Sequence, residues 1–208
     1  MRKIQIRQFR IKAVFALLCL FISVASQTVS ASAESIAQQA LPQQLISDLA
    51  IAVNASTAEK LKVVNDYFNG LRAVSDMSQW RSADYWSTPA ELLRKGGGDC
   101  EDFAIAKYLS LVQLGVAEQQ LRLMYVKRKL ANGRQEAHMV LSFIDADGDF
   151  HVLDNLNKSI KPLAQRTDLT PVYTFDSENV WLWTDASRSV YYGKSLQLTQ
   201  WRAFLARI

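Results

Sequence analysis

Cysteine and histidine are both scarce in this sequence, which has two of each in 208 residues. Cys19 lies in an apolar N-terminal run, so Cys100 is the only thiol in the rest of the chain. A single cysteine cannot form an internal disulfide, which excludes a disulfide framework for that part. The sequence also contains no internal repeat and no low-complexity segment. The lone thiol is therefore the first residue to consider for chemistry.

Residues 1–33 have the pattern of a secretory signal peptide. Basic residues precede an apolar run at 13–25, and positions 31–33 form a small-x-small cleavage site. The apolar run is too short to span a membrane comfortably, although an uncleaved N-terminal anchor is the alternative. We therefore expect an exported protein with one domain at 34–208 and no stable membrane insertion after cleavage.

The positive charge of the chain belongs to this predicted signal peptide. The whole chain has a net charge of +4, and residues 1–33 hold five basic and no acidic residues, so removing them leaves −1. We therefore expect no nucleic-acid partner, because no basic surface remains to bind phosphates. The 175 residues left of the 208 are enough for one domain with a sizeable core.

Hydrophobic periodicity predicts two helices on either side of an irregular segment. Ser56 and Glu59 have the spacing of a capping box, which predicts a helix over about 57–73. Residues 74–98 are aromatic and irregular, with a short helix possible at 91–95.

A central helix is predicted from about residue 100 to residue 114. Apolar residues surround most of its circumference, so this helix should be deeply buried, and Gly115 is a plausible stop. Three strand-like runs follow at 121–129, 138–144 and 150–156, joined by short turn sequences.

The only remaining cysteine stands at the start of that central helix. Three glycines, Gly96–Gly98, precede it and permit close backbone approach and unusual dihedral angles. A helix N-terminus favours the thiolate form of Cys100, which is a common way to make a nucleophile. Asp99, Glu101 and Asp102 crowd the same turn, however, and should raise the pKa of the thiol.

A base for this thiol depends on the register of one hairpin. If the loop is odd in length and centred on Asp147, Val140 faces Asp154, and His138 is a diagonal neighbour on the same face. A two-residue turn at Asp147-Gly148 would place His138 and Asp154 on opposite faces.

In the favourable register, Cys100, His138 and Asp154 are a candidate nucleophile, base and orienting carboxylate. Each also has an ordinary structural interpretation. A buried cysteine is often a small apolar residue, a histidine is often structural, and Asp154 could cap a turn. His151 has the opposite strand parity from Asp154 and is interpreted as a surface or structural residue.

The acidic residues beside the thiol allow two interpretations. Asp99 and Asp102 have the spacing of a helix cap. Alternatively, Asp99, Glu101 and Asp102 bind Ca²⁺, a hard cation that prefers oxygen ligands and would relieve their repulsion of the thiolate. A second acidic run, 145–149, is better explained by turn chemistry than by metal binding.

Four segments together resemble the bacterial transglutaminase-like cysteine proteinases, and the similarity runs from about Trp80 to Phe175. They read WSTPAE at 86–91, GGGDCEDFAIAKY at 96–108, AHMVL at 137–141 and VLDNL at 152–156. The resemblance implies an α+β, papain-like or transglutaminase-like fold, with the nucleophile at the N-terminus of a buried helix packed on an antiparallel sheet. It also implies the triad Cys100, His138 and Asp154.

The same resemblance implies a periplasmic, calcium-dependent cysteine endopeptidase formed by residues 34–208, with Asp99 and Glu101 as ligands and Asp102 as a third. Its implied substrate is the N-terminal region of a large cell-surface adhesin, cut at a paired-alanine site to promote biofilm detachment. Its implied inhibitor is an inner-membrane receptor that senses cyclic di-GMP. Two alternatives stay open: an acyl transferase or cell-wall peptide amidase with the same triad, and a non-enzymatic binding module with a relict triad.

Overall fold

A computed structural model of the chain describes residues 32–185 and 188–208. The predicted signal peptide therefore lies outside the described residues, except for its last two positions. Ser32 is the N-cap of helix α1 (Ala33–Ala40), and Ala33 is fully buried. Within the described ranges, no helix combines the length and the apolar character needed to cross a membrane.

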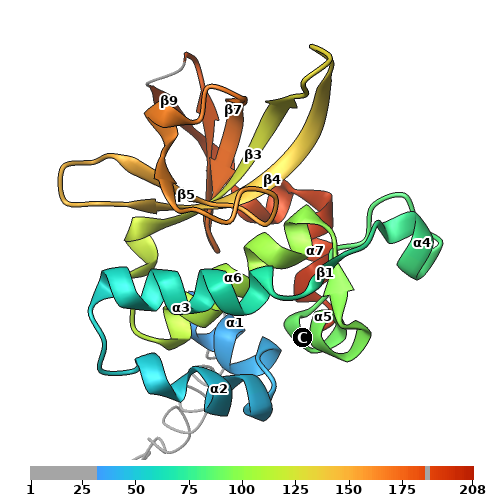
Figure 1. The fold of residues 1–208 in the computed structure, drawn as a ribbon, viewed down its shortest axis with the longest axis vertical. Helices are drawn as coiled ribbons and strands as arrows, with labels where there is room; N and C mark the ends of the chain where they lie inside the picture. Colours follow the sequence, from blue (N-terminus) through green and yellow to red (C-terminus); the bar gives the residue numbers. More distant parts are fainter. Residues whose placement is uncertain (1–31, 186–187) are drawn as a thin grey trace, which may run out of the picture. The chain divides into compact units, whose positions relative to one another are not determined.

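A seven-stranded sheet forms one layer of the fold, and every neighbouring pair of its strands is antiparallel (Figure 1). The strand order is β6-β5-β4-β3-β7-β8-β9. The strands are β3 (Leu121–Lys129), β4 (Gln135–Ile144), β5 (Phe150–Leu153), β6 (Lys161–Pro162), β7 (Leu169–Phe175), β8 (Asn179–Trp183) and β9 (Ser189–Lys194).

The helices lie mainly on one face of this sheet (Figure 1). They are α1, α2 (Gln43–Leu49), α3 (Thr57–Asn69), α4 (Asp76–Trp80), α5 (Pro89–Lys95), α6 (Cys100–Gln113) and α7 (Thr199–Leu205). Among the described residues, four short 3-10 turns lie at Ala50–Ala52, Glu118–Gln120, Leu163–Gln165 and Ser195–Gln197.

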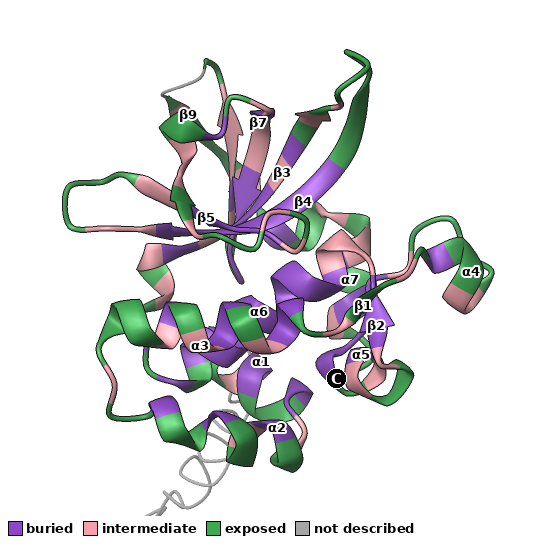
Figure 2. Ribbon diagram, viewed as in Figure 1, coloured by how far each residue is buried: buried purple, intermediate pink, exposed green. Residues whose placement is uncertain are grey.

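Helix α6 is the centre of the core. It packs against β3 and β4 of the sheet and against α1 and α3 of the helical layer. Residues 102–112 of this helix are all buried, as Figure 2 shows, which confirms the prediction from its apolar circumference. Gly115 adopts a φ of +80° just after the helix, as expected for a glycine stop. The fold is thus the α+β arrangement that the sequence predicted.

The predicted end of the first helix was wrong for a local reason. Helix α3 has the predicted capping box but ends at Asn69, because the chain continues into strand β1 (Arg72–Ala73). Strand β1 pairs in parallel with β2 (Gly97–Gly98), which ties the start of the irregular segment to its end. That segment also contains α4, which the sequence did not predict.

Candidate active site

The glycine run places Cys100 as the first residue of α6. Gly96 has a φ of +68° and ends α5, a conformation that suits glycine. A Cβ atom on Gly97 would collide with the backbone of β1, and one on Gly98 would collide with the carboxylate of Asp102. The chain can therefore pass between β1 and the α6 N-terminus only because these positions lack side chains.

The hairpin between β4 and β5 has the register that brings His138 and Asp154 together. Phe143 pairs with His151 across an odd-length loop, as the favourable alternative required. His138 Nε2 and Asp154 Oδ1 are 2.9 Å apart, and both side chains are buried. The predicted contact between these two residues is confirmed.

Cys100 and His138 line the same cavity, whose volume is about 660 Å³. Because Nε2 of His138 contacts Asp154, Nδ1 is the ring nitrogen left to take a proton from a thiol. Tyr125 and Tyr173 also line the cavity, with their rings stacked at a centroid distance of 5.0 Å. The cavity therefore combines a thiol, an oriented imidazole and an aromatic wall.

The surroundings of the thiol oppose its ionisation. Burial is the largest cause that raises the pKa of Cys100, followed by the negative charge of Glu101. The thiol donates a hydrogen bond to Glu101 Oε2 over 3.0 Å. The backbone of Met139 acts in the opposite direction and lowers the pKa. The conflict expected between a nucleophile and its acidic neighbours is therefore present in the structure.

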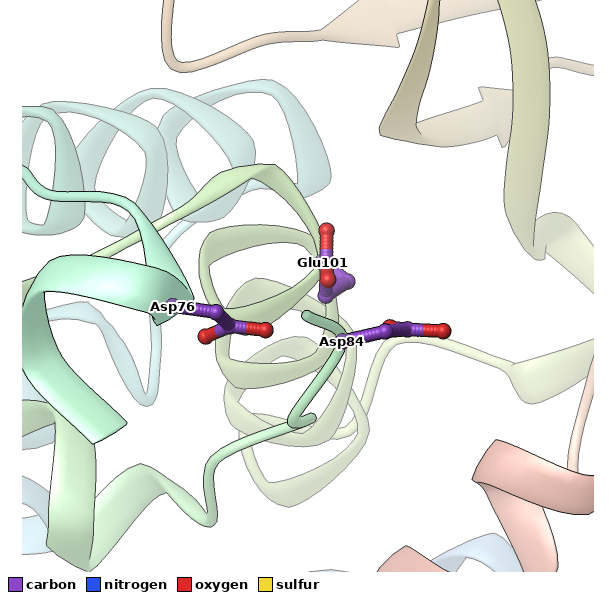
Figure 3. A group of neighbouring side chains, drawn as sticks. All are labelled: Asp76, Asp84 and Glu101. Carbon is purple, nitrogen blue, oxygen red and sulfur yellow. The ribbon is translucent and has the colours of Figure 1, made fainter. Parts of the chain in front are cut away.

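Two further carboxylates join the predicted acidic cluster. One oxygen each from Asp76, Asp84 and Glu101 lie within 4.8 Å of one another, and the same holds for Asp76, Asp99 and Asp102. Figure 3 shows the first group, in which the three residues come from α4, the loop after it and the start of α6. Sequence patterns did not point to Asp76 or Asp84, because they lie in the segment interpreted as irregular.

A hydrogen bond from a backbone N–H to a side-chain carboxylate holds the loop that carries Asp84 against α4. The N–H of Tyr85 donates to Asp76 Oδ2, and Asp84 Oδ1 accepts from the indole N–H of Trp86. The side chain of Gln200, in α7, donates to the carbonyl oxygen of Asp84 over 3.0 Å. Residues far apart in the sequence therefore set the position of this carboxylate.

Three carboxyl groups of the cluster are harder to ionise than in water. Burial is the main cause that raises the pKa of Asp99, Glu101 and Asp102, and the charge of Asp99 adds to the effect on the other two. The pKa of Asp102 reaches about 7. The buried Oδ1 atoms of Asp76 and Asp99 have no hydrogen-bond partner among the described residues. Such a set of crowded oxygens is suited to a hard cation.

Asp102 differs from the other members because backbone groups already occupy both of its oxygens. Oδ1 accepts from the N–H of Ser87 at 2.6 Å, and Oδ2 accepts from the N–H of Asp99 at 3.2 Å. Asp102 therefore caps α6, which is the capping alternative raised by the sequence. It also ties the loop at Ser87, which precedes α5, to the start of α6.

The second acidic run, at 145–149, forms a turn. Asp145 Oδ1 accepts from the backbone N–H groups of Asp147 and Asp149 at 3.0 and 2.9 Å. Its other oxygen lies 2.7 Å from Nε2 of His151, a half-exposed side chain. The interpretation of this run as turn chemistry is confirmed, and His151 has a structural partner on the same turn.

Asp154 is held by groups on both of its oxygens. Oδ1 also accepts from the N–H of Leu156, which turns the chain and ends β5 earlier than predicted. Oδ2 accepts from Nη2 of Arg166 at 2.8 Å. Burial alone would raise the pKa of Asp154, but the hydrogen bonds from His138, Leu156 and Arg166 outweigh it and hold the pKa at about 2. Asp154 is therefore ionised.

A buried lysine connects α6 to the segment that carries Asp154. Lys107 is fully buried, and its Nζ donates to Oδ1 of Asn65 and of Asn69 at 2.9 and 2.8 Å. Asn69 in turn donates to the carbonyl oxygen of Asp154 at 2.9 Å. Burial lowers the pKa of Lys107 to about 7. Lys107 lies in an otherwise apolar helix, and in the sequence this position is a sign that a buried lysine with polar partners could be expected there.

Comparisons with known proteins agree with this site. The sequence profile of the bacterial transglutaminase-like cysteine proteinases, BTLCP, matches residues 36–189. Two solved structures of LapG from Legionella pneumophila are similar in fold. The EGTA-treated form has 35% identity and a TM-score of 0.66 and covers 84% of this chain and 95% of its own. The calcium-bound form has 34% identity and a TM-score of 0.65 and covers 84% and 96%.

A comparison with curated proteins gives no match. The profile covers well over half of the chain, and LapG is more than 30% identical over most of both chains. The chain therefore belongs to the bacterial transglutaminase-like cysteine proteinase family.

Proposed function

We propose that this protein is a calcium-dependent cysteine endopeptidase with Cys100 as nucleophile, His138 as general base and Asp154 as the carboxylate that orients the base. The observation that carries the proposal is the 2.9 Å contact of His138 with Asp154 in a cavity that Cys100 also lines. The family, a group of cysteine proteinases, supports the same assignment.

The reaction follows from these roles. His138 Nδ1 takes the proton of Cys100, and the thiolate attacks the carbonyl carbon of the scissile peptide bond. Backbone N–H groups at the start of α6 stabilise the oxyanion that forms. The imidazolium then protonates the leaving amine, and the thioester is hydrolysed by a water that gives its proton to His138. Asp154 stays ionised and stabilises the imidazolium.

We propose that the acidic cluster at the N-terminus of α6 holds Ca²⁺, with Asp76, Asp84, Asp99 and Glu101 as ligands and Asp102 at the edge of the site. The two buried Oδ1 atoms without partners support this assignment, as does the all-oxygen donor set. Bound Ca²⁺ would supply positive charge that offsets the carboxylates beside the thiol. In its absence, Glu101 and Asp99 both raise the pKa of Cys100.

We further propose that the substrate is the N-terminal region of a large cell-surface adhesin, cut at a paired-alanine site. The protease would act in the periplasm after export through its signal peptide, and an inner-membrane receptor for cyclic di-GMP would inhibit it. The motifs shared with the family support this assignment.

Cleavage of a purified adhesin fragment tests the function. We expect two products in the presence of Ca²⁺, none with EGTA, and none with the Cys100→Ala variant. Adding a primary amine to the same reaction separates hydrolysis from acyl transfer, since a transferase would attach the amine to the substrate. Undiminished cleavage by Cys100→Ala would rule out the thiol mechanism. If Cys100 is alkylated slowly, and at the same rate in the native protein and in His138→Ala, the site is a relict without enzymatic activity.

A further inference from the structure

A buried arginine lies directly behind the orienting carboxylate of the proposed triad. Arg166 follows the 3-10 turn Leu163–Gln165 and is 4% exposed. Its Nη2 donates both to Asp154 Oδ2 and to Asp168 Oδ2, each at 2.8 Å. Its Nε donates to Asp168 Oδ1 at 2.9 Å. One guanidinium therefore bridges two carboxylates, one buried and one partly exposed.

The backbone fixes this pair to the sheet. The carbonyl oxygen of Asp168 accepts from the N–H of Lys129, the last residue of β3, at 2.7 Å. The N–H of Leu169, the first residue of β7, donates to the carbonyl oxygen of Arg166 at 2.9 Å. The turn is thus anchored to two adjacent strands, which makes its side chains a rigid support.

A positive charge beside Asp154 would by itself work against catalysis. The negative charge of Asp154 stabilises an imidazolium on His138. A guanidinium bound to Oδ2 of Asp154, with no other counter-ion, would partly cancel that charge and weaken the stabilisation. Asp168 counters this effect, because it takes two hydrogen bonds from Arg166. The three charged groups together carry −1, which leaves one negative charge to face His138.

The planar guanidinium also restricts geometry. Two parallel hydrogen bonds to Asp168 fix the plane of the guanidinium, and a lysine ammonium could not reproduce that fork. With Oδ2 of Asp154 held by Nη2, Oδ1 is directed at His138.

We propose that Arg166 and Asp168 are positioning residues for the base: Arg166 orients the Asp154 carboxylate toward His138, and Asp168 holds and neutralises Arg166. This inference rests on the proposed function, because it assigns a role to groups behind the proposed triad. Neither residue lines the cavity that Cys100 and His138 share, so each would act through Asp154.

The test compares Asp168→Asn, Arg166→Lys and Arg166→Met in the full-length protein with saturating Ca²⁺. We expect kcat for the adhesin fragment to fall between about tenfold and a hundredfold in Arg166→Met and Arg166→Lys, with KM within about twofold. Asp168→Asn keeps the shape of the side chain and loses its charge, so kcat should fall by a smaller factor. Alkylation of Cys100 by iodoacetamide should slow in the same order.

A matched control lies on the same sheet. Arg128 and Glu136 form a partly exposed arginine–carboxylate pair between β3 and β4, so Glu136→Gln removes an ion pair away from Asp154. It should leave kcat and alkylation unchanged. Thermal melting of each variant identifies any that fail to fold, and Asp168→Asn, at a partly exposed position, keeps the test decisive if Arg166→Met does not fold.

Any one of three results would overturn the inference. They are full activity in folded Arg166→Lys, unchanged kcat in folded Asp168→Asn, and a loss that appears only in KM and in melting temperature. Cys100→Ala and His138→Ala in the same assay separate this failure from that of the proposed function. If those two variants are inactive while the Arg166 and Asp168 variants are not, only the positioning role fails. If they retain activity, the triad itself fails.

Discussion

The thiol of Cys100 donates a hydrogen bond to Oε2 of Glu101 over 3.0 Å, which joins the proposed nucleophile directly to the acidic cluster. Burial raises the pKa of this thiol most, and the Glu101 charge is the second cause. The reactive thiol and the proposed cation site therefore share one carboxylate. Neutralising that carboxylate removes one of the two main obstacles to forming the thiolate.

Replacing Glu101 should separate these two roles. In EGTA, Glu101→Gln should alkylate with iodoacetamide several times faster than the native protein, because the negative charge beside the thiol is gone. In a calcium titration of adhesin cleavage, the same variant should need more Ca²⁺ for half-maximal activity. Glu136→Gln is the control for removal of a distant carboxylate. Equal alkylation rates for Glu101→Gln and the native protein in EGTA would contradict the proposed effect of Glu101.

Asp76 and Asp84 should matter for calcium although no sequence motif marks them. Asp76→Asn and Asp84→Asn each remove one charged oxygen ligand, so the Ca²⁺ concentration for half-maximal cleavage should rise by roughly tenfold or more. Isothermal titration with Ca²⁺ alone gives the same comparison without substrate. Asp145→Asn, in the acidic turn at 145–149, should leave the calcium response unchanged. A shift for Asp145→Asn as large as that for Asp84→Asn would place the cation elsewhere.

Lys107 should give the protein a stability that rises with pH above neutrality. Its pKa is lowered to about 7 in the folded state, below the ordinary lysine value of 10.5, so the unfolded chain binds more protons between these values. Relative to Lys107→Met, the native protein should gain up to about 1.4 kcal/mol per pH unit across that window. Urea unfolding at pH 6, 8 and 9.5 measures this difference.

An exposed lysine is the control for Lys107. Lys62 lies on α3 with 75% of its side chain exposed, so Lys62→Met measures the effect of losing a lysine that folding does not bury. A pH-independent difference for Lys107→Met would mean that Lys107 is fully charged in the folded protein.

Asp154→Asn should lose stability as well as activity. The pKa of Asp154 is about 2 in the folded protein against 3.8 as the ordinary value, so its contribution is present above pH 3.8 and is lost as the pH falls toward 2. This shift corresponds to about 2 kcal/mol of unfolding free energy at pH 7. Urea unfolding of the native protein and the variant at pH 7 and pH 2.5 should show the difference shrinking at the lower pH. A difference that is the same at both values would assign the loss to packing.

Much of the framework could be predicted from local sequence patterns. The apolar circumference of residues 100–114 predicted the buried helix, and the capping box at Ser56 predicted the start of α3. The run at 121–129 matches β3, because an apolar run and the turn sequence after it are local features. Family motifs marked Cys100, His138 and Asp154 as the residues to examine.

The supporting residues could not be predicted in this way. Arg166 and Asp168 resemble an ordinary polar turn in the sequence, and their contact with Asp154 depends on how that turn is anchored to β3 and β7. Asp76 and Asp84 lie in a segment without periodicity, and long-range contacts bring them to Glu101.

By itself, the sequence determined the local chemistry of this protein: a lone thiol at the start of an apolar helix, flanked by carboxylates and preceded by glycines. Only the tertiary structure decided which distant groups meet there. The odd-length loop between β4 and β5 set the strand register, and a shift of one residue would have turned His138 away from Asp154. Burial then determined the charge of each group, because desolvation and neighbouring charges depend on packing that no local segment contains.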